Sequence, residues 1–293
     1  MPNHLDSISH CLLNGKLLSV GDAALSVFDR GFSIADGLFE TILIKNATPI
    51  WWQAHLARLK HGMKILHINT PIDDKKLWQD TKKLLAANHC QTNKNYVLRL
   101  TLSRGVFMMR GLWQKAKKKP TILLTLHHPS PVATSVDAYI ATITRKNHLS
   151  PLSGIKWLGG YGDNILAHHS HIIRKKNNAT QDILLLNGKD HLVSASTSNI
   201  FILLDDWQTP QPSDGIISGI ARAKILQSPL ITVKEKTIPL SAIKKARAAF
   251  TSNSLRLEPI TTIDNRTLPD YHLGIDICQK LTALYCKPPS ASL

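Results

Sequence analysis

The chain has 293 residues, of which 43% are hydrophobic, and its formal net charge is +16. This length and composition suit one large or two smaller globular domains and exclude a collagen-like or low-complexity chain. No run of 18 apolar residues is present, and no basic segment followed by a long apolar one opens the sequence, so we expect a cytoplasmic protein with neither a membrane span nor a secretory signal.

The positive charge gathers in short clusters of lysine and arginine at 115–119, 174–176 and 244–247. Such clusters occur in nucleic-acid-binding proteins and also on solvated protein surfaces. No recognisable nucleic-acid-binding motif accompanies them, so we expect no nucleic-acid partner. None of the four cysteines forms a CxxC pair, and the histidines at 168–171 have no evident carboxylate or cysteine partner, so no metal site is predicted.

Hydrophobic periodicity predicts four elements in the first half of the chain. Helices are expected over 53–66 and 75–88. The segment 96–103 alternates, with its tyrosine and leucines on one face and Val97, Arg99, Thr101 and Ser103 on the other, which predicts a strand. A second strand is expected over 121–126.

The second half mixes both kinds of element. We expect strands over 138–144, 182–186 and 199–204, and helices over 163–176 and 219–226. Because helices and strands follow one another without regular βαβ alternation, the pattern favours an α+β fold over a doubly wound sheet. The polar segment 127–134, which carries two prolines, is the best linker candidate; it separates a predicted domain over 1–126 from a larger one over 135–293.

Six short segments together indicate the function of the chain. They are DRGFSIADGLFET (29–41), HLARL (55–59), GIKWL (154–158), STSNIF (196–201), GIISGIAR (215–222) and TSNSLRLEPI (251–260). Their order and spacing resemble the class IV aminotransferase family, the fold-type IV pyridoxal phosphate enzymes, over about residues 12–265. The resemblance implies a two-domain α+β enzyme of the D-amino acid aminotransferase-like type. It also implies pyridoxal 5'-phosphate as cofactor and a homodimer with shared active sites.

Lys156 matches the Schiff-base lysine of that family. A lysine in a site of low polarity becomes neutral more easily, so it can attack the aldehyde of the cofactor. Once released by substrate, the same amine can serve as the base at the substrate Cα. From the residue alone, an ordinary surface lysine among 36 basic residues is the alternative.

A phosphate site is also implied by the resemblance. Arg58 in HLARL matches the family arginine that binds the phosphate from a helix, and an arginine fork suits a phosphate. A loop enters a helix at Gly219, where backbone N–H groups favour an anion; a simple capping turn is the alternative. The resemblance further implies cofactor contacts from Ser198, Asn199, Ile220, Ala221, Ser252 and Asn253.

For the substrate, we expect a small anionic molecule. Arg104 and Arg110 bracket the loop SRGVFMMRG, and arginines suit a substrate with two carboxylates, although a solvated loop arginine is the alternative. Thr41 is a candidate catalytic hydroxyl, with a structural hydrogen bond as the alternative. Phe39 stands where many transaminases of the family carry tyrosine, and phenylalanine is seen in the pattern of the family's lyases.

Two departures from the family pattern stand out. Ser194 occupies the position of a glutamate that keeps the pyridine nitrogen of the cofactor protonated, so we expect this cofactor contact to leave the nitrogen unprotonated and to disfavour transamination. The glycine-rich segment 159–164 replaces a leucine-asparagine segment after Lys156. The resulting expectation is a lyase that eliminates pyruvate from 4-amino-4-deoxychorismate, with a branched-chain or D-amino acid transaminase as the alternative.

Overall fold

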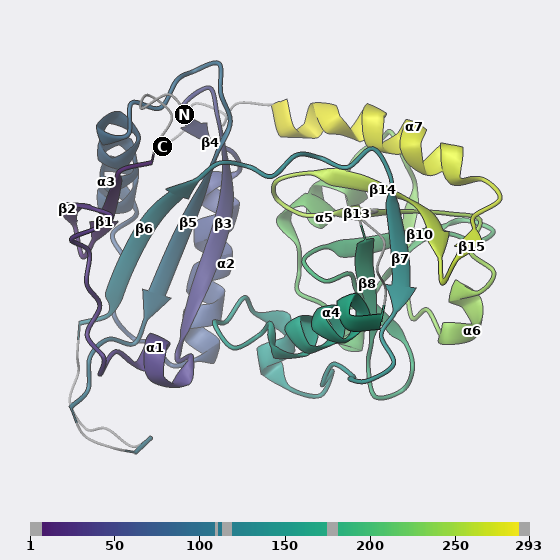
Figure 1. Ribbon diagram of the computed structural model, residues 1–293, viewed down its shortest axis with the longest axis horizontal. Coiled ribbons are helices and arrows are strands. Elements are labelled where there is room, and N and C mark those ends of the chain that lie inside the picture. Colours follow the sequence, from purple (N-terminus) through teal and green to yellow (C-terminus); the bar gives the residue numbers. More distant parts are fainter. Residues whose placement is uncertain (1–7, 109–110, 113–118, 175–180, 287–293) are drawn as a thin grey trace. The chain divides into compact units, whose positions relative to one another are not determined.

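The computed structural model describes residues 8–108, 111–112, 119–174 and 181–286. These residues form two compact units (Figure 1). Unit 1 holds the described chain up to Pro129 together with Lys156–Gly159, and unit 2 holds Ser130–Ile155 and the described chain from Gly160 onward. None of the described helices is long and apolar enough to cross a membrane.

Unit 1 is built on an antiparallel sheet with the strand order β2-β1-β6-β5-β3-β4. Its strands are β1 (His10–Leu13), β2 (Lys16–Ser19), β3 (Gly37–Lys45), β4 (Thr48–Pro49), β5 (Tyr96–Ser103) and β6 (Thr121–His127). Its helices are α1 (Arg30–Ile34), α2 (Trp52–Ile65) and α3 (Asp74–Ala87). Helix α2 packs against β3, and α3 packs against β1 (Figure 1).

The segment Lys156–Gly159 belongs to unit 1 because it is hydrogen-bonded to the start of β3. The Phe39 amide donates to the Lys156 carbonyl at 3.0 Å, and the Leu158 amide donates to the Gly37 carbonyl at 3.0 Å. Trp157 forms an isolated bridge with Leu38. The predicted domain boundaries, which place Lys156 in the C-terminal domain, stay a prediction.

Unit 2 contains a mixed sheet with the order β12-β11-β10-β13-β14-β7-β8-β9, and β15 pairs with β14. Its strands are β7 (Val136–Ile140), β8 (Gln181–Leu186), β9 (Leu192–Ser194), β10 (Asn199–Leu203), β11 (Trp207–Pro210), β12 (Val233–Lys236), β13 (Ala248–Ser252), β14 (Leu257–Ile263) and β15 (Arg266–Thr267). Its helices are α4 (Gly162–Arg174), α5 (Ile220–Leu226), α6 (Leu240–Ile243) and α7 (Tyr271–Leu281). Short 3₁₀ turns occur at Pro151–Gly154, Pro212–Asp214 and Thr282–Cys286.

The two faces of β8 pack into different cores, as strand alternation requires. Leu184 and Leu186 are fully buried in the main core of unit 2, while Ile183 and Leu185 belong to a smaller cluster that includes Ala167 of α4. The hydrophobic run of this strand therefore has apolar partners on both sides.

One predicted strand was partly wrong. The strand expected over 138–144 begins at Val136 and ends at Ile140. Beyond Ile140, the carbonyls of Ala141 and Thr144 accept hydrogen bonds from the Arg145 guanidinium, at 3.0 and 2.9 Å, instead of from a neighbouring strand. The last two residues of the helix predicted over 163–176 lie outside the described residues.

Candidate active site

Lys156 lies beside an aromatic ring and two arginines of unit 1. Its Nζ is 4.1 Å from the centroid of the Phe39 ring. Burial, followed by the positive charges of Arg58 and Arg99, lowers the pKa of Lys156 from 10.5 to about 7, although Glu40 opposes the shift. A large share of this amine is therefore neutral near pH 7, as a nucleophile requires. Such an environment differs from that of an ordinary surface lysine.

This lowered pKa predicts an unusual reactivity for the cofactor-free protein. Acetic anhydride reacts with neutral amines, so labelling of Lys156 should rise through a midpoint near pH 7, whereas an unshifted lysine titrates about three pH units higher. Peptide mass spectrometry after brief labelling at a series of pH values measures the labelling midpoint of Lys156 and those of the exposed lysines. A midpoint for Lys156 near that of the exposed lysines would contradict the assigned environment.

Behind this lysine, Glu40 of β3 meets two residues of α2. The Arg58 Nε and Nη2 donate to the two Glu40 carboxylate oxygens at 2.8 and 2.6 Å, and the His55 ring is 2.7 Å from Oε2 through Nδ1. The Glu40 side chain is 1% exposed and that of His55 is not exposed. Burial alone would raise the pKa of Glu40, but Arg58 and His55 lower it to about 2.

Arg58 is thus oriented by a buried carboxylate. Residues 55 and 58 are three apart, so they share one face of α2. Glu40 accepts from two of the five guanidinium N–H donors, and it holds the planar group in one orientation. That Arg58 binds a phosphate stays a prediction, but a fixed guanidinium next to a reactive lysine suits it.

Arg99 is a site residue that the sequence interpretation did not select. It is paired with Thr41 across the β3–β5 ladder, and Phe39 lies two residues along the same face. The Arg99 guanidinium lies 4.1 Å from the centroid of the Phe39 ring. The alternation of the strand over 96–103 already put this charged residue on the face away from the leucines, and that was the available signal. Thr41 lies on the same face as Phe39.

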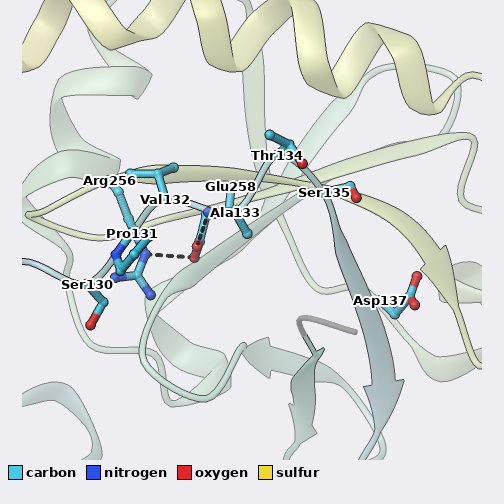
Figure 2. Close-up of a pocket in the computed structure, with 9 residues that line it drawn as sticks. All are labelled: Ser130, Pro131, Val132, Ala133, Thr134, Ser135, Asp137, Arg256 and Glu258. Carbon is cyan, nitrogen blue, oxygen red and sulfur yellow. Dashed lines mark hydrogen bonds and ion pairs between the residues drawn. The ribbon is translucent and has the colours of Figure 1, made fainter. Parts of the chain in front are cut away.

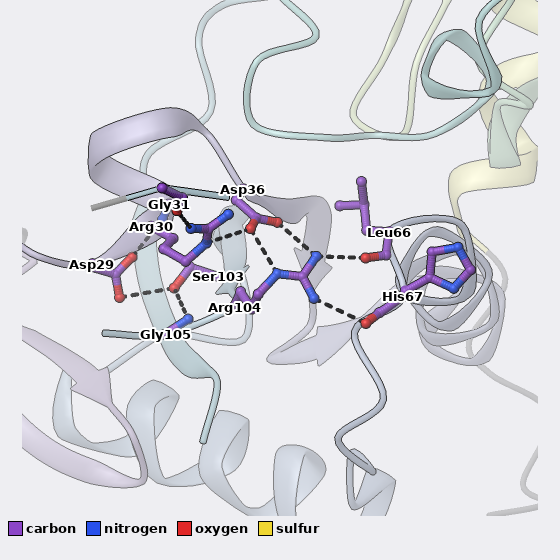
Figure 3. Close-up of polar contacts among 10 residues, drawn as sticks. Asp29, Arg30, Gly31, Asp36, Leu66, His67, Ser103, Arg104 and Gly105 are labelled. Carbon is purple, nitrogen blue, oxygen red and sulfur yellow. Dashed lines mark hydrogen bonds and ion pairs between the residues drawn. The ribbon is translucent and has the colours of Figure 1, made fainter. Parts of the chain in front are cut away.

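Arg104, whose predicted contact with the substrate stays a prediction, is bonded to Asp36 and to two backbone carbonyls (Figure 3). Its Nε and Nη2 donate to the Asp36 carboxylate at 2.7 and 3.0 Å, and Nη1 and Nη2 donate to the carbonyls of His67 and Leu66 at 3.0 and 2.6 Å. Arg30 also donates to Asp36 at 2.8 Å. Despite burial, these arginines lower the pKa of the Asp36 carboxyl. The guanidinium therefore fastens the end of β5 to the segments around it.

Arg110, the other predicted substrate ligand, lies outside the described residues. Its role as a carboxylate ligand stays a prediction.

In unit 2, the other predicted cofactor residues gather around two strand ends. Asn199 and Ser252 are opposite each other in the β10–β13 ladder, and Asn253 donates to the Ser198 hydroxyl at 3.0 Å. A Cβ on Gly219 would be 1.8 Å from the Asn199 side-chain oxygen, so this close approach requires glycine. Ile220 and Ala221, the first residues of α5, follow directly.

Ser252 gives a direct indication that this cluster fits a polar group. Its hydroxyl is buried and has no hydrogen-bond partner among the described residues. An unsatisfied buried hydroxyl costs about 1–3 kcal/mol, which a phosphate oxygen accepting from it would remove. Within unit 2, this buried hydroxyl without a partner therefore fits a phosphate oxygen.

Ser194 ends β9 opposite Leu185 of β8, and its side chain is partly buried. The glycine-rich segment 159–164 is hydrogen-bonded to the turn that follows Ser194 and β9. Asn164 donates to the Ser196 carbonyl at 2.5 Å, while Lys146 donates to the Gly160 carbonyl and the Asn164 side-chain oxygen, both at 3.0 Å.

A separate open pocket of about 640 Å³ lies in unit 2 (Figure 2). It is lined by 130–135, Asp137, Arg256 and Glu258. Glu258 forms an ion pair with Arg256 at 2.9 Å and accepts from the Ala133 amide at 3.3 Å. None of the predicted site residues lines this pocket, so we do not assign the cofactor to it.

Comparisons with known proteins identify the class. The sequence model of class IV amino-transferases matches residues 37–263, and the chain belongs to this family. The family depends on pyridoxal 5'-phosphate and has the fold-type IV architecture, as the sequence resemblance implied.

Individual relatives differ in activity. A protein of Methanocaldococcus jannaschii, provisionally named branched-chain-amino-acid aminotransferase, is 28% identical over 92% of both chains. The aminodeoxychorismate lyase of Bacillus subtilis is 24% identical over 86% of both chains. The crystal structure of 4-amino-4-deoxychorismate lyase from Pseudomonas aeruginosa superposes with a TM-score of 0.75 and 25% identity, and the match covers 93% of this chain and 98% of that one.

Proposed function

We propose that this chain is a pyridoxal phosphate-dependent lyase that eliminates pyruvate from 4-amino-4-deoxychorismate and gives 4-aminobenzoate for folate synthesis. We choose a lyase over a transaminase because the centroid of the Phe39 ring lies 4.1 Å from the Lys156 amine. A phenylalanine there leaves no phenolic hydroxyl beside the lysine, and the resemblance associates tyrosine with many transaminases. The lyases among the similar proteins support the same choice.

When bound, the cofactor supplies an electron sink for negative charge that develops at the substrate Cα. Lys156, with its lowered pKa, takes the proton from Cα as a neutral amine and returns a proton during elimination. Arg99 neutralises a substrate carboxylate on the Phe39 face of β3. The family resemblance implies that Arg58, Ile220, Ala221, Ser252 and Asn253 would hold the phosphate.

The test is a pyruvate assay with 4-amino-4-deoxychorismate on the purified holoprotein, with 4-aminobenzoate quantified by chromatography in the same sample. Equal amounts of both products support the lyase. Cofactor uptake without either product contradicts it.

The second candidate is an aminotransferase for branched-chain or D-amino acids. It is favoured by the 28% identity to the Methanocaldococcus jannaschii protein. Steady amino transfer from an amino acid to a 2-oxo acid, in the absence of pyruvate release from the chorismate, identifies this activity.

We further propose that the enzyme is a homodimer. In unit 1, apolar side chains stand exposed on a short stretch of chain around α1: Val27 is 69%, Phe28 45%, Phe32 75% and Ile34 47% exposed. Clustered exposed apolar residues mark protein contacts. A second copy of this chain is the partner that the family resemblance implies.

Phe32→Asp should convert the dimer to a monomer of 32.5 kDa, because a buried, unpaired carboxylate opposes association. Sedimentation velocity of wild type and variant measures this. Leu149→Asp, at an apolar position of unit 2 that is 81% exposed, is the matched control and should stay dimeric. A monomeric wild type, or a dimeric Phe32→Asp protein, would refute the interface.

A further inference from the structure

Tyr285 is a buried tyrosine that the proposed mechanism leaves unused. It lies in the 3₁₀ turn Thr282–Cys286, which follows α7 in unit 2, and it is 5% exposed. Its hydroxyl donates to the Asn253 carbonyl at 2.6 Å, and the Arg256 carbonyl is a second acceptor at 3.2 Å. Burial, followed by the influence of Cys278, raises the pKa of Tyr285, so the hydroxyl stays protonated and remains a donor.

Both acceptors belong to the hairpin loop 253–256, which joins β13 to β14. The loop is closed on itself, because the Asn253 amide donates to the Arg256 carbonyl at 3.0 Å. The Asn253 side-chain oxygen also accepts from the Leu255 and Arg256 amides at 2.8 and 3.1 Å. Helix α7 packs on both strands, and the turn that follows it brings Tyr285 to the loop from outside the hairpin. The tyrosine therefore fixes the main chain of the loop.

The planar peptide bond transmits this contact to the next residue. In a trans peptide the carbonyl and the following N–H point in opposite directions, and the described residues contain no cis peptide bond. Because the Asn253 carbonyl accepts from the Tyr285 hydroxyl, the Ser254 N–H points away from the tyrosine. This N–H has no hydrogen-bond acceptor within the described part of the chain.

The end of β13 and its loop thus carry two donors without an acceptor in the described structure. One is the Ser254 N–H, and the other is the Ser252 hydroxyl, whose residue is 1% exposed. Unpaired donors close together on one short segment suit an anion. A carbonyl oxygen turned toward the same anion would repel it, so the direction of the peptide between Asn253 and Ser254 decides whether the loop attracts or opposes a phosphate.

We propose that Tyr285 is a positioning residue for the phosphate of the cofactor: its hydroxyl holds the Asn253 carbonyl away from the phosphate and thereby aims the Ser254 N–H at it. The inference rests on the proposed function, which supplies the phosphorylated ligand. Without the hydroxyl, the peptide between Asn253 and Ser254 is free to turn its carbonyl toward the anion. Tyr285→Phe keeps the ring and its packing, and we expect it to weaken phosphate binding about tenfold.

NMR can observe this one peptide. The dipeptide Asn-Ser occurs once in the sequence, at 253–254, so protein labelled with ¹³C at the asparagine carbonyls and with ¹⁵N at serine gives one carbonyl-correlated amide signal. Inorganic phosphate is titrated into the cofactor-free full-length protein at constant pH and ionic strength. We expect the Ser254 amide proton to shift downfield to saturation in wild type, and Tyr285→Phe to need about ten times more phosphate.

A second measurement separates positioning of the phosphate from general support of the fold. Affinities for pyridoxal 5'-phosphate and for pyridoxal, which lacks the phosphate, are measured by absorbance titration. Tyr285→Phe should lose about tenfold of the first affinity and keep the second. Tyr139→Phe is the matched control, because it removes another hydroxyl of unit 2, one that is 3.3 Å from the Asn265 side-chain oxygen. This control should keep both affinities.

A Ser254 signal that does not move with phosphate in wild type overturns the inference without any variant having to fold. An equal loss of both affinities in Tyr285→Phe, or no loss of either, overturns it as well. A wild-type holoprotein that binds phosphate as expected but releases no pyruvate from 4-amino-4-deoxychorismate refutes the proposed function and leaves the role of Tyr285 standing, so the two failures are distinguished.

Discussion

A Lys156→Ala variant should lose the covalently held cofactor and at least about a thousandfold of kcat, because one side chain supplies both the nucleophile and the base. The structure places this amine beside Phe39 and lowers its pKa to about 7, so no ordinary lysine can take its place. Borohydride treatment of the wild-type holoprotein, followed by peptide mass spectrometry, should find the cofactor fixed to Lys156.

The matched control is Lys60→Ala, which removes a lysine from a half-exposed ion pair with Asp74 on the same unit. This variant should keep both the cofactor and the activity. If Lys156→Ala retains wild-type kcat, or if the fixed cofactor is found on another lysine, the central assignment of the site is wrong.

Local sequence patterns predicted the regular elements well where tertiary contacts agree with them. The alternation over 96–103 matches β5, and the helical period over 53–66 matches α2 to within one residue at each end. The strand predicted over 138–144 was too long. Beyond Ile140 the carbonyls of Ala141 and Thr144 accept hydrogen bonds from the Arg145 side chain, and hydrophobic periodicity does not reveal such a contact. Helix α7 was not predicted, and it packs on β13 and β14.

In the candidate site, too, some residues could be predicted from the sequence, whereas their contacts appear only in the fold. The resemblance identified Lys156 and Arg58 because both stand in short motifs of fixed spacing. The carboxylate that orients Arg58 is 18 positions away in β3, and sequence shows only that Glu40 and Arg58 are both charged. Their pairing depends on how α2 packs against the sheet. For Arg104 the sequence could not show that Asp36 and two backbone carbonyls engage its guanidinium.

Asp182 illustrates what an isolated sequence can show and what it cannot. An acid beside the run ILLL is visible as a charge next to a buried strand. Its connection to the turn after Ser194 appears only in the fold, through the Ser196 amide. Residues 182 and 194 are 12 positions apart in the sequence, whereas in the fold the Asp182 carboxylate accepts from the turn that follows Ser194.

The second large effect is expected from Glu40→Gln. This change leaves Arg58 and the fully buried His55 around a neutral amide, and breaking a buried ion pair by removing one partner costs about 3–5 kcal/mol of unfolding free energy. Urea unfolding at pH 7 measures the loss. Lys60→Ala again serves as control, because its half-exposed pair should contribute no more than about 1 kcal/mol.

The pH dependence separates the charge of Glu40 from its packing. The pKa of Glu40 is lowered from 4.5 to about 2 in the folded protein, so its contribution to stability is complete above pH 4.5 and is lost as the pH falls toward 2. The difference in unfolding free energy between wild type and Glu40→Gln should therefore shrink over that window. A difference that stays constant from pH 7 to pH 2 would mean that packing of the side chain, and not its charge, stabilises the fold. Because Glu40 also raises the pKa of Lys156, the variant should shift the acetylation midpoint of Lys156 below 7, and an unchanged midpoint would show that the two groups do not interact.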